Sequence, residues 1–198
     1  MRAAAAVGVG AALLAAFAPS VPASRQAAVG AAPVTVLLVR HAEKAAQGGS
    51  DPALSEAGRA RAAELARTCA AARPSTLFCS TFARTRQTLE PLAQASGLQP
   101  QARDPKQVDA LAAELRALAP GSTAVVAGHS NTVPALAKAL GAELHGLTNG
   151  MLAETDYDRL FVLSIDPAGT RATGCVELRY GAPSVAPPAA PGAAPAAK

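Results

Sequence analysis

The stretch that decides the fold is Val34-Thr-Val-Leu-Leu-Val39, which leads directly into Arg40 and His41. Its unbroken apolar and largely β-branched run is typical of a strand that is buried on both faces of a sheet. Two more runs of strand length follow, over residues 76–79 and 123–127, and polar side chains come after each of them. We therefore expect a central sheet whose strands end at a common polar rim.

Helical patterns separate these strands. They predict helices over residues 56–72, 83–95, 108–118 and 131–140, and we expect a bend at Pro91 because proline removes a backbone donor. Two last apolar runs, 160–165 and 173–180, flank a turn at 166–169 and predict a hairpin at the sheet edge. Alternating strands and helices predict an α/β fold, a three-layer sandwich with a mostly parallel central sheet and helices on both faces.

The two ends of the chain differ in composition from its middle. A basic start, an uncharged run from Ala3 to Ala18 and the sequence Val21-Pro-Ala23 predict a signal peptide over residues 1–23. The alternative is a membrane anchor, but this run is shorter than the roughly 20 residues that a spanning helix needs. We then expect a linker over 24–33, a folded domain over 34–181 and a disordered Ala/Pro-rich tail over 182–198.

This organisation predicts an exported protein, periplasmic or secreted, with no stable membrane insertion after cleavage. The formal net charge of +4 is mild, and there is no long basic run and only 3% of aromatic residues, so we expect no nucleic-acid partner. Three cysteines are present. In an oxidising compartment Cys69 and Cys79 are candidates for a disulfide with Cys175 free, or all three are buried thiols.

Three cationic motifs are expected to meet at the rim of the sheet. Arg40 and His41 follow the first strand, Arg84 follows the second, and His129 follows the third. Arginine side chains hold phosphate oxygens through paired donors, and the start of the helix that opens at Asn131 adds backbone donors. This set favours a dianionic phosphomonoester, with one imidazole attacking phosphorus while the other, protonated, neutralises charge on the oxygens.

Metal binding by the two histidines is the alternative for this rim. Neighbouring arginines repel cations, and no carboxylate pair is obvious nearby, so we expect neither a metal nor another cofactor.

Four motifs together resemble the histidine phosphatase superfamily, the phosphoglycerate mutase-like group: Val39-Arg-His-Ala-Glu43, Leu54-Ser-Glu-Ala-Gly58, Ser80-x-x-x-Arg84-Thr-Arg-Gln-Thr88 and Gly128-His-Ser130. The resemblance covers residues 34 to about 140 and implies the family's phosphoglycerate mutase-like α/β fold. It implies that His41 becomes phosphorylated, and that Arg40, Arg84 and His129 form the phosphate pocket. Leu54 and Gly58 match positions that look structural, and residues 156–161 resemble a segment of small exported members.

The resemblance leaves the proton donor open. Ser130 stands where the acid phosphatase branch of the family has an aspartate. Asp104 is our candidate donor, although a turn residue before Pro105 is the alternative interpretation; Glu43 and Asp156 are weaker candidates. We expect Ser130 and Glu43 to contact the substrate as well.

The sequence therefore predicts a metal-independent phosphomonoester hydrolase with a phosphohistidine intermediate on His41. Its activity should be bell-shaped in pH, because His41 must be neutral while His129 is charged. The alternatives are a phosphohistidine phosphatase, a mutase, and a non-catalytic phospholigand-binding protein of the same fold. The expected ligand is a phosphorylated small molecule.

Overall fold

The computed structural model describes residues 31–166 and 172–184. The predicted signal peptide over 1–23, most of the predicted linker, most of the turn at 166–169 and the tail beyond residue 184 lie outside the described residues. Within the described ranges, no helix combines the length and the apolar character that crossing a bilayer requires.

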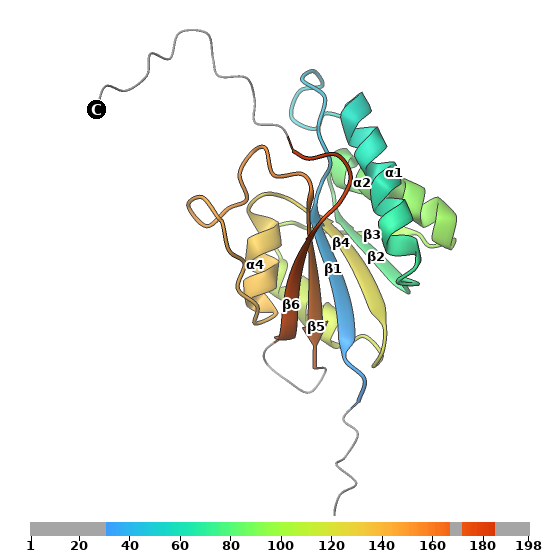
Figure 1. Cartoon of the computed structure of the whole chain (residues 1–198), viewed down its shortest axis with the longest axis vertical. Coiled ribbons are helices and arrows are strands. Elements are labelled where there is room, and N and C mark those ends of the chain that lie inside the picture. Colours follow the sequence, from blue (N-terminus) through green and yellow to red (C-terminus); the bar gives the residue numbers. More distant parts are fainter. Residues whose placement is uncertain (1–30, 167–171, 185–198) are drawn as a thin grey trace, which may run out of the picture. The chain divides into compact units, whose positions relative to one another are not determined.

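A six-stranded mixed sheet forms the centre, in the order β3-β2-β4-β1-β5-β6 (Figure 1). The four neighbouring strands β3, β2, β4 and β1 run parallel to one another, and β5 runs antiparallel to both of its neighbours, β1 and β6. The strands are β1 (Val34–Arg40), β2 (Thr76–Ser80), β3 (Pro100–Arg103), β4 (Thr123–Gly128), β5 (Arg159–Ile165) and β6 (Ala172–Arg179). The mostly parallel sheet and the hairpin at its edge are as the sequence predicts.

Four helices cover the two faces of this sheet: α1 (Glu56–Ala70), α2 (Ala83–Ser96), α3 (Val108–Arg116) and α4 (Thr132–Ala139). Side chains of β1 alternate between two apolar clusters, as expected for a strand buried on both faces. Leu37 and Val39 pack with residues of α1 and α2, whereas Val36 and Leu38 pack with residues of α3 and α4. The three-layer α/β architecture is therefore confirmed.

The start of α1 is fixed by its cap and by a close contact with the chain that follows His41. The Ser55 hydroxyl accepts a hydrogen bond from the amide of Gly58 at 3.1 Å, which satisfies one free donor of the first turn. A β-carbon on Gly58 would lie 2.1 Å from the carbonyl oxygen of Glu43. Leu54, just before the cap, is buried with Ala42. The structural roles predicted for Leu54 and Gly58 are confirmed.

The sheet register places the ends of three strands at one level. Arg40 pairs with Gly128 across β1 and β4, and Cys79 of β2 pairs with the residue before Gly128. The amide of His41 donates to the carbonyl of Gly128 at 2.8 Å, which continues the ladder one residue beyond β1. The residues that follow β1, β2 and β4 therefore emerge at the same edge of the sheet.

Candidate functional site

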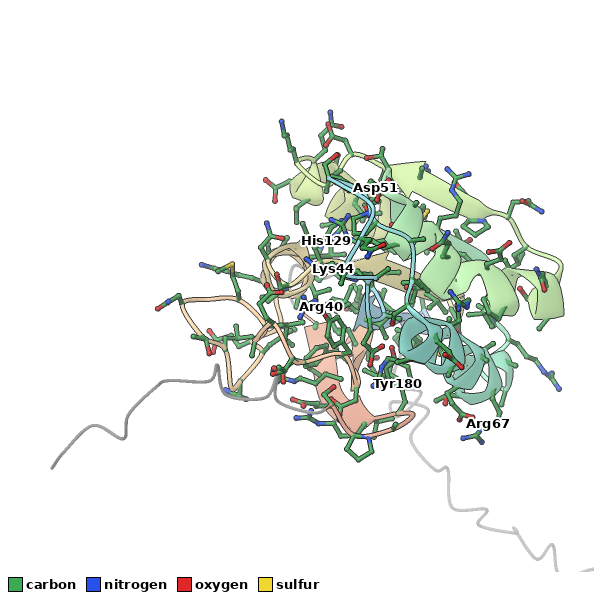
Figure 2. The ribbon with its side chains drawn as sticks, turned by 90° about the horizontal axis from the view of Figure 1, so that it is seen from above. Arg40, Lys44, Asp51, Arg67, His129 and Tyr180 are labelled. Atoms are coloured by element: carbon green, nitrogen blue, oxygen red, sulfur yellow. The ribbon has the colours of Figure 1, made fainter. Side chains whose placement is uncertain are left out.

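A cavity of about 340 Å³ opens at this edge. Its ionisable lining residues are Arg40, His41, Lys44, Arg84, Lys106, His129 and Glu154. In the view onto the carboxyl ends of the strands, three of them, Arg40, Lys44 and His129, lie close together (Figure 2). Four permanently cationic side chains against one carboxylate produce a positive field, which suits an anionic ligand.

The imidazole of His41 is held in one tautomer by its own backbone. Its Nδ1 lies 2.8 Å from the carbonyl oxygen of Ala42. Because a carbonyl only accepts, Nδ1 carries the proton and Nε2 keeps its lone pair. The amide of Ala42 in turn donates to the Thr88 hydroxyl of α2 at 2.9 Å. A neutral ring with an unprotonated Nε2 is the form that a nucleophile requires.

The second imidazole lies beside the first. The ring centroids of His41 and His129 are 5.3 Å apart, with their planes 64° from parallel. The Nε2 of His129 lies 2.8 Å from the hydroxyl of Ser80, the last residue of β2, and that hydroxyl also contacts the hydroxyl of Thr85 at 2.9 Å. Ser80 therefore holds the ring through Nε2 on its inner side, and Nδ1 faces Arg84 on the other side.

Arg84 contacts the outer nitrogen of the His129 ring. Its Nη2 lies 3.5 Å from Nδ1 of His129, and a guanidinium only donates, so Nδ1 is the acceptor. Asp51 fixes Arg84 from the other side: its carboxylate accepts from Nη1 of Arg84 at 3.2 Å and from the amide of Ala83 at 2.9 Å. Asp51 thus orients the start of α2 together with its arginine.

Arg40 is almost fully buried and is held by a segment far along the chain. Its Nη1 donates to the carbonyl of Ala153 at 2.7 Å, and its Nη2 donates to the carboxylate of Glu154 at 3.0 Å. The ring of Tyr157 lies 4.3 Å from the guanidinium carbon, at the distance of a cation–π contact. The segment from Ala153 to Tyr157 therefore sets the direction of this arginine.

Both imidazoles have lowered pKa values. Burial is the main cause for His41 and brings its pKa to about 3, against the raising effect of the hydrogen bond to the Ala42 carbonyl. The positive charges of Arg40 and Arg84 lower it further, as does His129 where that ring is protonated. Burial also lowers the pKa of His129, to about 4, with Arg84 and Arg40 adding to the effect. Both rings are neutral at pH 7 in this environment. The sequence predicts a charged His129, which would need a nearby anion to offset the two arginines.

The structure brings most of the predicted site residues to the cavity, but not all of them. Arg40, His41, Arg84, His129 and Ser130 line it. The predicted substrate contact Glu43 does not line it, because both of its carboxylate oxygens accept from Arg61 of α1, at 2.7 to 2.9 Å.

The candidate donors Asp104 and Asp156 are also held elsewhere. The carboxylate of Asp104 accepts from the amide of Lys106 at 2.9 Å, which is the contact of a turn residue. Asp156 contacts Arg159 and the amide of Ala153. Neither aspartate is among the residues that line the cavity.

The charged contributors that sequence reasoning missed are Lys44, Asp51, Lys106 and Glu154. Lys44 stands just after the motif that contains Arg40 and His41, and Lys106 is two residues from the candidate donor Asp104. Asp51 and Glu154 lie in loops with no regular pattern, and only their ion pairs with Arg84 and Arg40 reveal them.

The cysteines do not contribute to the site. All three are free thiols, with Cys69 and Cys79 buried in the cluster under α1 and α2, and Cys175 exposed on β6. The candidate pairing of Cys69 with Cys79 is therefore absent, and burial raises the pKa of the Cys69 thiol to about 12. The two buried thiols act as small apolar side chains of the core.

Comparison with known proteins places the fold. Residues 36–105 match the model of the histidine phosphatase superfamily (branch 1), a stretch that contains Arg40, His41 and Arg84 and ends before β4. No curated protein matches the chain.

Solved structures share this fold over most of the chain. A protein assigned as the phosphohistidine phosphatase SixA from Agrobacterium tumefaciens is 26% identical with a TM-score of 0.56, covering 76% of this chain and 99% of that one. Its counterpart from Nakamurella multipartitia is 27% identical with a TM-score of 0.56, covering 79% and 99%. Phosphoglycerate mutase from Plasmodium falciparum, 16% identical with a TM-score of 0.51 over 79% and 95%, shows the fold alone.

Proposed function

Because the chain belongs to the histidine phosphatase superfamily, we propose that it is a phosphomonoester hydrolase with a phosphohistidine intermediate on His41. One observation carries this proposal. The imidazoles of His41 and His129 lie 5.3 Å apart at a cavity lined by cationic side chains, and Nε2 of His41 is unprotonated. A phosphoryl group at this cavity would meet a nucleophile and several donors at once.

In the first step, Nε2 of His41 attacks phosphorus and the ester P–O bond breaks. The departing alkoxide takes a proton from water. Arg40 and Arg84 donate hydrogen bonds to the phosphoryl oxygens, where negative charge is concentrated in the transition state. The bound dianion raises the pKa of His129, so that Nδ1 takes up a proton and donates to the same oxygens. In the second step, water attacks phosphorus, the P–N bond breaks, and inorganic phosphate leaves with His41 neutral again.

The proposed reaction needs no metal ion, because cationic side chains already supply the positive charge. Arg40, Lys44, Arg84 and Lys106 would repel a cation from the cavity, and the lining carboxylate, Glu154, is paired with Arg40. A metal ion would therefore find few oxygen ligands there.

Replacing the proposed nucleophile tests the function. We expect His41→Ala to lower kcat for p-nitrophenyl phosphate by on the order of 10⁴-fold or more. The wild-type protein should form an acid-labile phosphoprotein with ³²P-labelled substrate, and the variant should not. His145→Ala is the matched control, because the side chain of His145 is exposed and outside the cavity. Turnover by a folded His41→Ala protein would rule out this mechanism.

A phosphohistidine phosphatase is the second candidate, and the state of the proton donor favours it. Among the described residues, the one carboxylate that lines the cavity is Glu154, and it is ion-paired with Arg40. An alkyl phosphate needs its leaving oxygen protonated, whereas an imidazole protonated in solution leaves readily from a P–N bond. The likeness to proteins assigned as SixA agrees with this class.

Leaving-group dependence separates the two candidates. A phosphohistidine phosphatase should hydrolyse a phosphohistidine peptide and p-nitrophenyl phosphate, and act poorly on alkyl phosphates such as glycerol phosphate. Similar rates on all three would favour a general phosphomonoesterase. Phosphate binding without labelling or release would instead support a phospholigand-binding protein.

A further inference from the structure

Glu154 is the feature of the cavity that the proposed chemistry does not use. Its carboxylate accepts from Nη2 of Arg40 at 3.0 Å. Arg40 itself is only 2% exposed, while the side chain of Glu154 is 76% exposed. The arginine is therefore fixed in place, and the carboxylate reaches it from the solvent side of the cavity.

Glu154 occupies a donor that a bound phosphate would need. Each terminal nitrogen of Arg40 carries two N–H donors, and an oxyanion is held most strongly where two parallel donors are free. Nη1 already donates to the carbonyl of Ala153 at 2.7 Å, and Nη2 donates to Glu154. A ligand oxygen that takes Nη2 must displace the Glu154 carboxylate or share that nitrogen with it, at the cost of repulsion between two negative charges.

The remaining contacts of Arg40 do not depend on the Glu154 carboxylate. The Ala153 carbonyl is a backbone group, and the Tyr157 ring contacts the guanidinium 4.3 Å away. Two of the three contacts that orient Arg40 therefore persist when the Glu154 side chain moves away or loses its charge.

We propose that Glu154 is a specificity-determining residue, an internal carboxylate that competes with ligands for Arg40. The inference rests on the proposed function, because it assumes that the cavity binds a phosphoryl group. A ligand that carries a carboxylate would only exchange the Glu154–Arg40 ion pair for an equivalent one, so its binding gains little free energy. A phosphoryl dianion carries more charge and more oxygens, so it displaces Glu154, and the return of Glu154 to Arg40 aids release of the inorganic phosphate product.

Glu154→Gln tests the proposal, because it removes the charge and keeps the shape. Titration calorimetry at pH 7.5 with inorganic phosphate should show binding about threefold to tenfold tighter than in the wild type, the scale of one partly exposed charge interaction. Acetate should also begin to inhibit hydrolysis of p-nitrophenyl phosphate. We expect KM to fall and kcat to stay equal or decrease, because phosphate release slows.

Glu64→Gln is the matched control, because Glu64 pairs with Arg67 on the exposed side of α1 and lies outside this cavity. Phosphate affinity in Glu154→Gln that is unchanged, or weaker than in Glu64→Gln, would overturn the proposal; weaker binding would show that Glu154 only positions Arg40. Phosphate binding is measured without turnover. The result therefore stands apart from the His41 labelling experiment, which alone decides whether the protein is a hydrolase.

Discussion

At the scale of single residues, two buried imidazoles carry a stability cost that depends on pH. The pKa values of His41 and His129 are about 3 and about 4, below the ordinary value of 6.5, with burial as the first cause in both. The unfolded chain binds protons at both rings as the pH falls below 6.5, whereas the folded protein does not until the pH approaches 4. Stability is therefore full above about pH 7 and falls as the pH decreases.

We predict that the free energy of unfolding decreases as the pH falls from 6.5 to 4.5. At the steepest point the unfolded chain binds almost two more protons than the folded protein, which gives a slope of about 2 to 3 kcal/mol per pH unit. Urea unfolding followed by circular dichroism at half-unit pH intervals measures this slope. The carboxylates with lowered pKa values, Asp158, Glu114 and Glu177, begin to lose their contributions only below about pH 4.5.

Each of His41→Ala and His129→Ala should remove about half of that slope. An equal slope in wild type and in both variants would show that other groups carry the pH dependence.

Site residues that follow a buried strand could be predicted from the sequence, whereas the direction of a side chain in a turn could not. Arg40, His41, Arg84 and His129 follow buried strands, and parallel strands end at one edge, so their convergence follows from the pattern. Asp104 follows a short strand as well, but its carboxylate turns back to the amide of Lys106. The direction of a side chain in a turn depends on local hydrogen bonds, which the pattern of apolar residues does not describe.

At the scale of elements, the segment between α4 and β5 is the part of the site that sequence reasoning could not assign. The family resemblance includes residues 156–161 but implies no chemical role for them. The ring of Tyr157 contacts Arg40, and the carbonyl of Ala153 accepts a hydrogen bond from Arg40 although 113 positions separate the two residues in sequence. Arg159 anchors the same segment through Glu177 of β6, at 2.7 Å. Contacts over such sequence distances depend on tertiary packing, so no local pattern indicates them.

The contact between α1 and the chain after β1 gives a prediction about an element. We expect Gly58→Ala to lower the free energy of unfolding by about 1 to 3 kcal/mol or more, the usual cost of overpacking. A β-carbon there would lie 2.1 Å from the Glu43 carbonyl, so the strand end or the helix must shift. Because Glu43 is two residues from His41, kcat should fall too. Thermal unfolding and p-nitrophenyl phosphate assays measure both effects.

Gly174→Ala provides the control for this substitution. The nearest atom to a β-carbon at Gly174 is Cβ of Ser164, at 4.0 Å, an ordinary contact. This variant should keep its stability and activity. A Gly58→Ala protein as stable and as active as Gly174→Ala would contradict the packing role of Gly58.

At the scale of the whole molecule, the layers could be predicted because apolar runs of strand length alternate with amphipathic helices. The strand that escaped prediction is β3, Pro100–Arg103, where the sequence Pro-Gln-Ala-Arg offers neither β-branched residues nor alternation. It pairs only with β2 at the sheet edge, and its residues are partly or fully exposed. Parallel pairing with a buried neighbour, rather than its own propensity, makes it a strand.

The charge of the molecule is not spread evenly around the cavity. Lys44 and Lys106 are exposed at its rim, above the buried Arg40 and the mostly buried Arg84, on loops that follow β1 and β3. Cationic rims of this kind attract anions before any contact is made, and salt weakens the attraction over a Debye length of about 10 Å at 0.1 M. The rim lysines should therefore increase capture of the phosphorylated ligand rather than the rate of chemistry.

We predict that the double variant Lys44→Gln/Lys106→Gln has kcat/KM for p-nitrophenyl phosphate about threefold to tenfold lower at low salt, with kcat nearly unchanged. Its kcat/KM should also depend less on NaCl concentration, because two of the attracting charges are gone. Lys138→Gln removes an exposed lysine in the last turn of α4, away from the cavity, and should behave as the wild type. A double variant that loses kcat, or keeps the full salt dependence, would assign these lysines a contact with the reacting group instead.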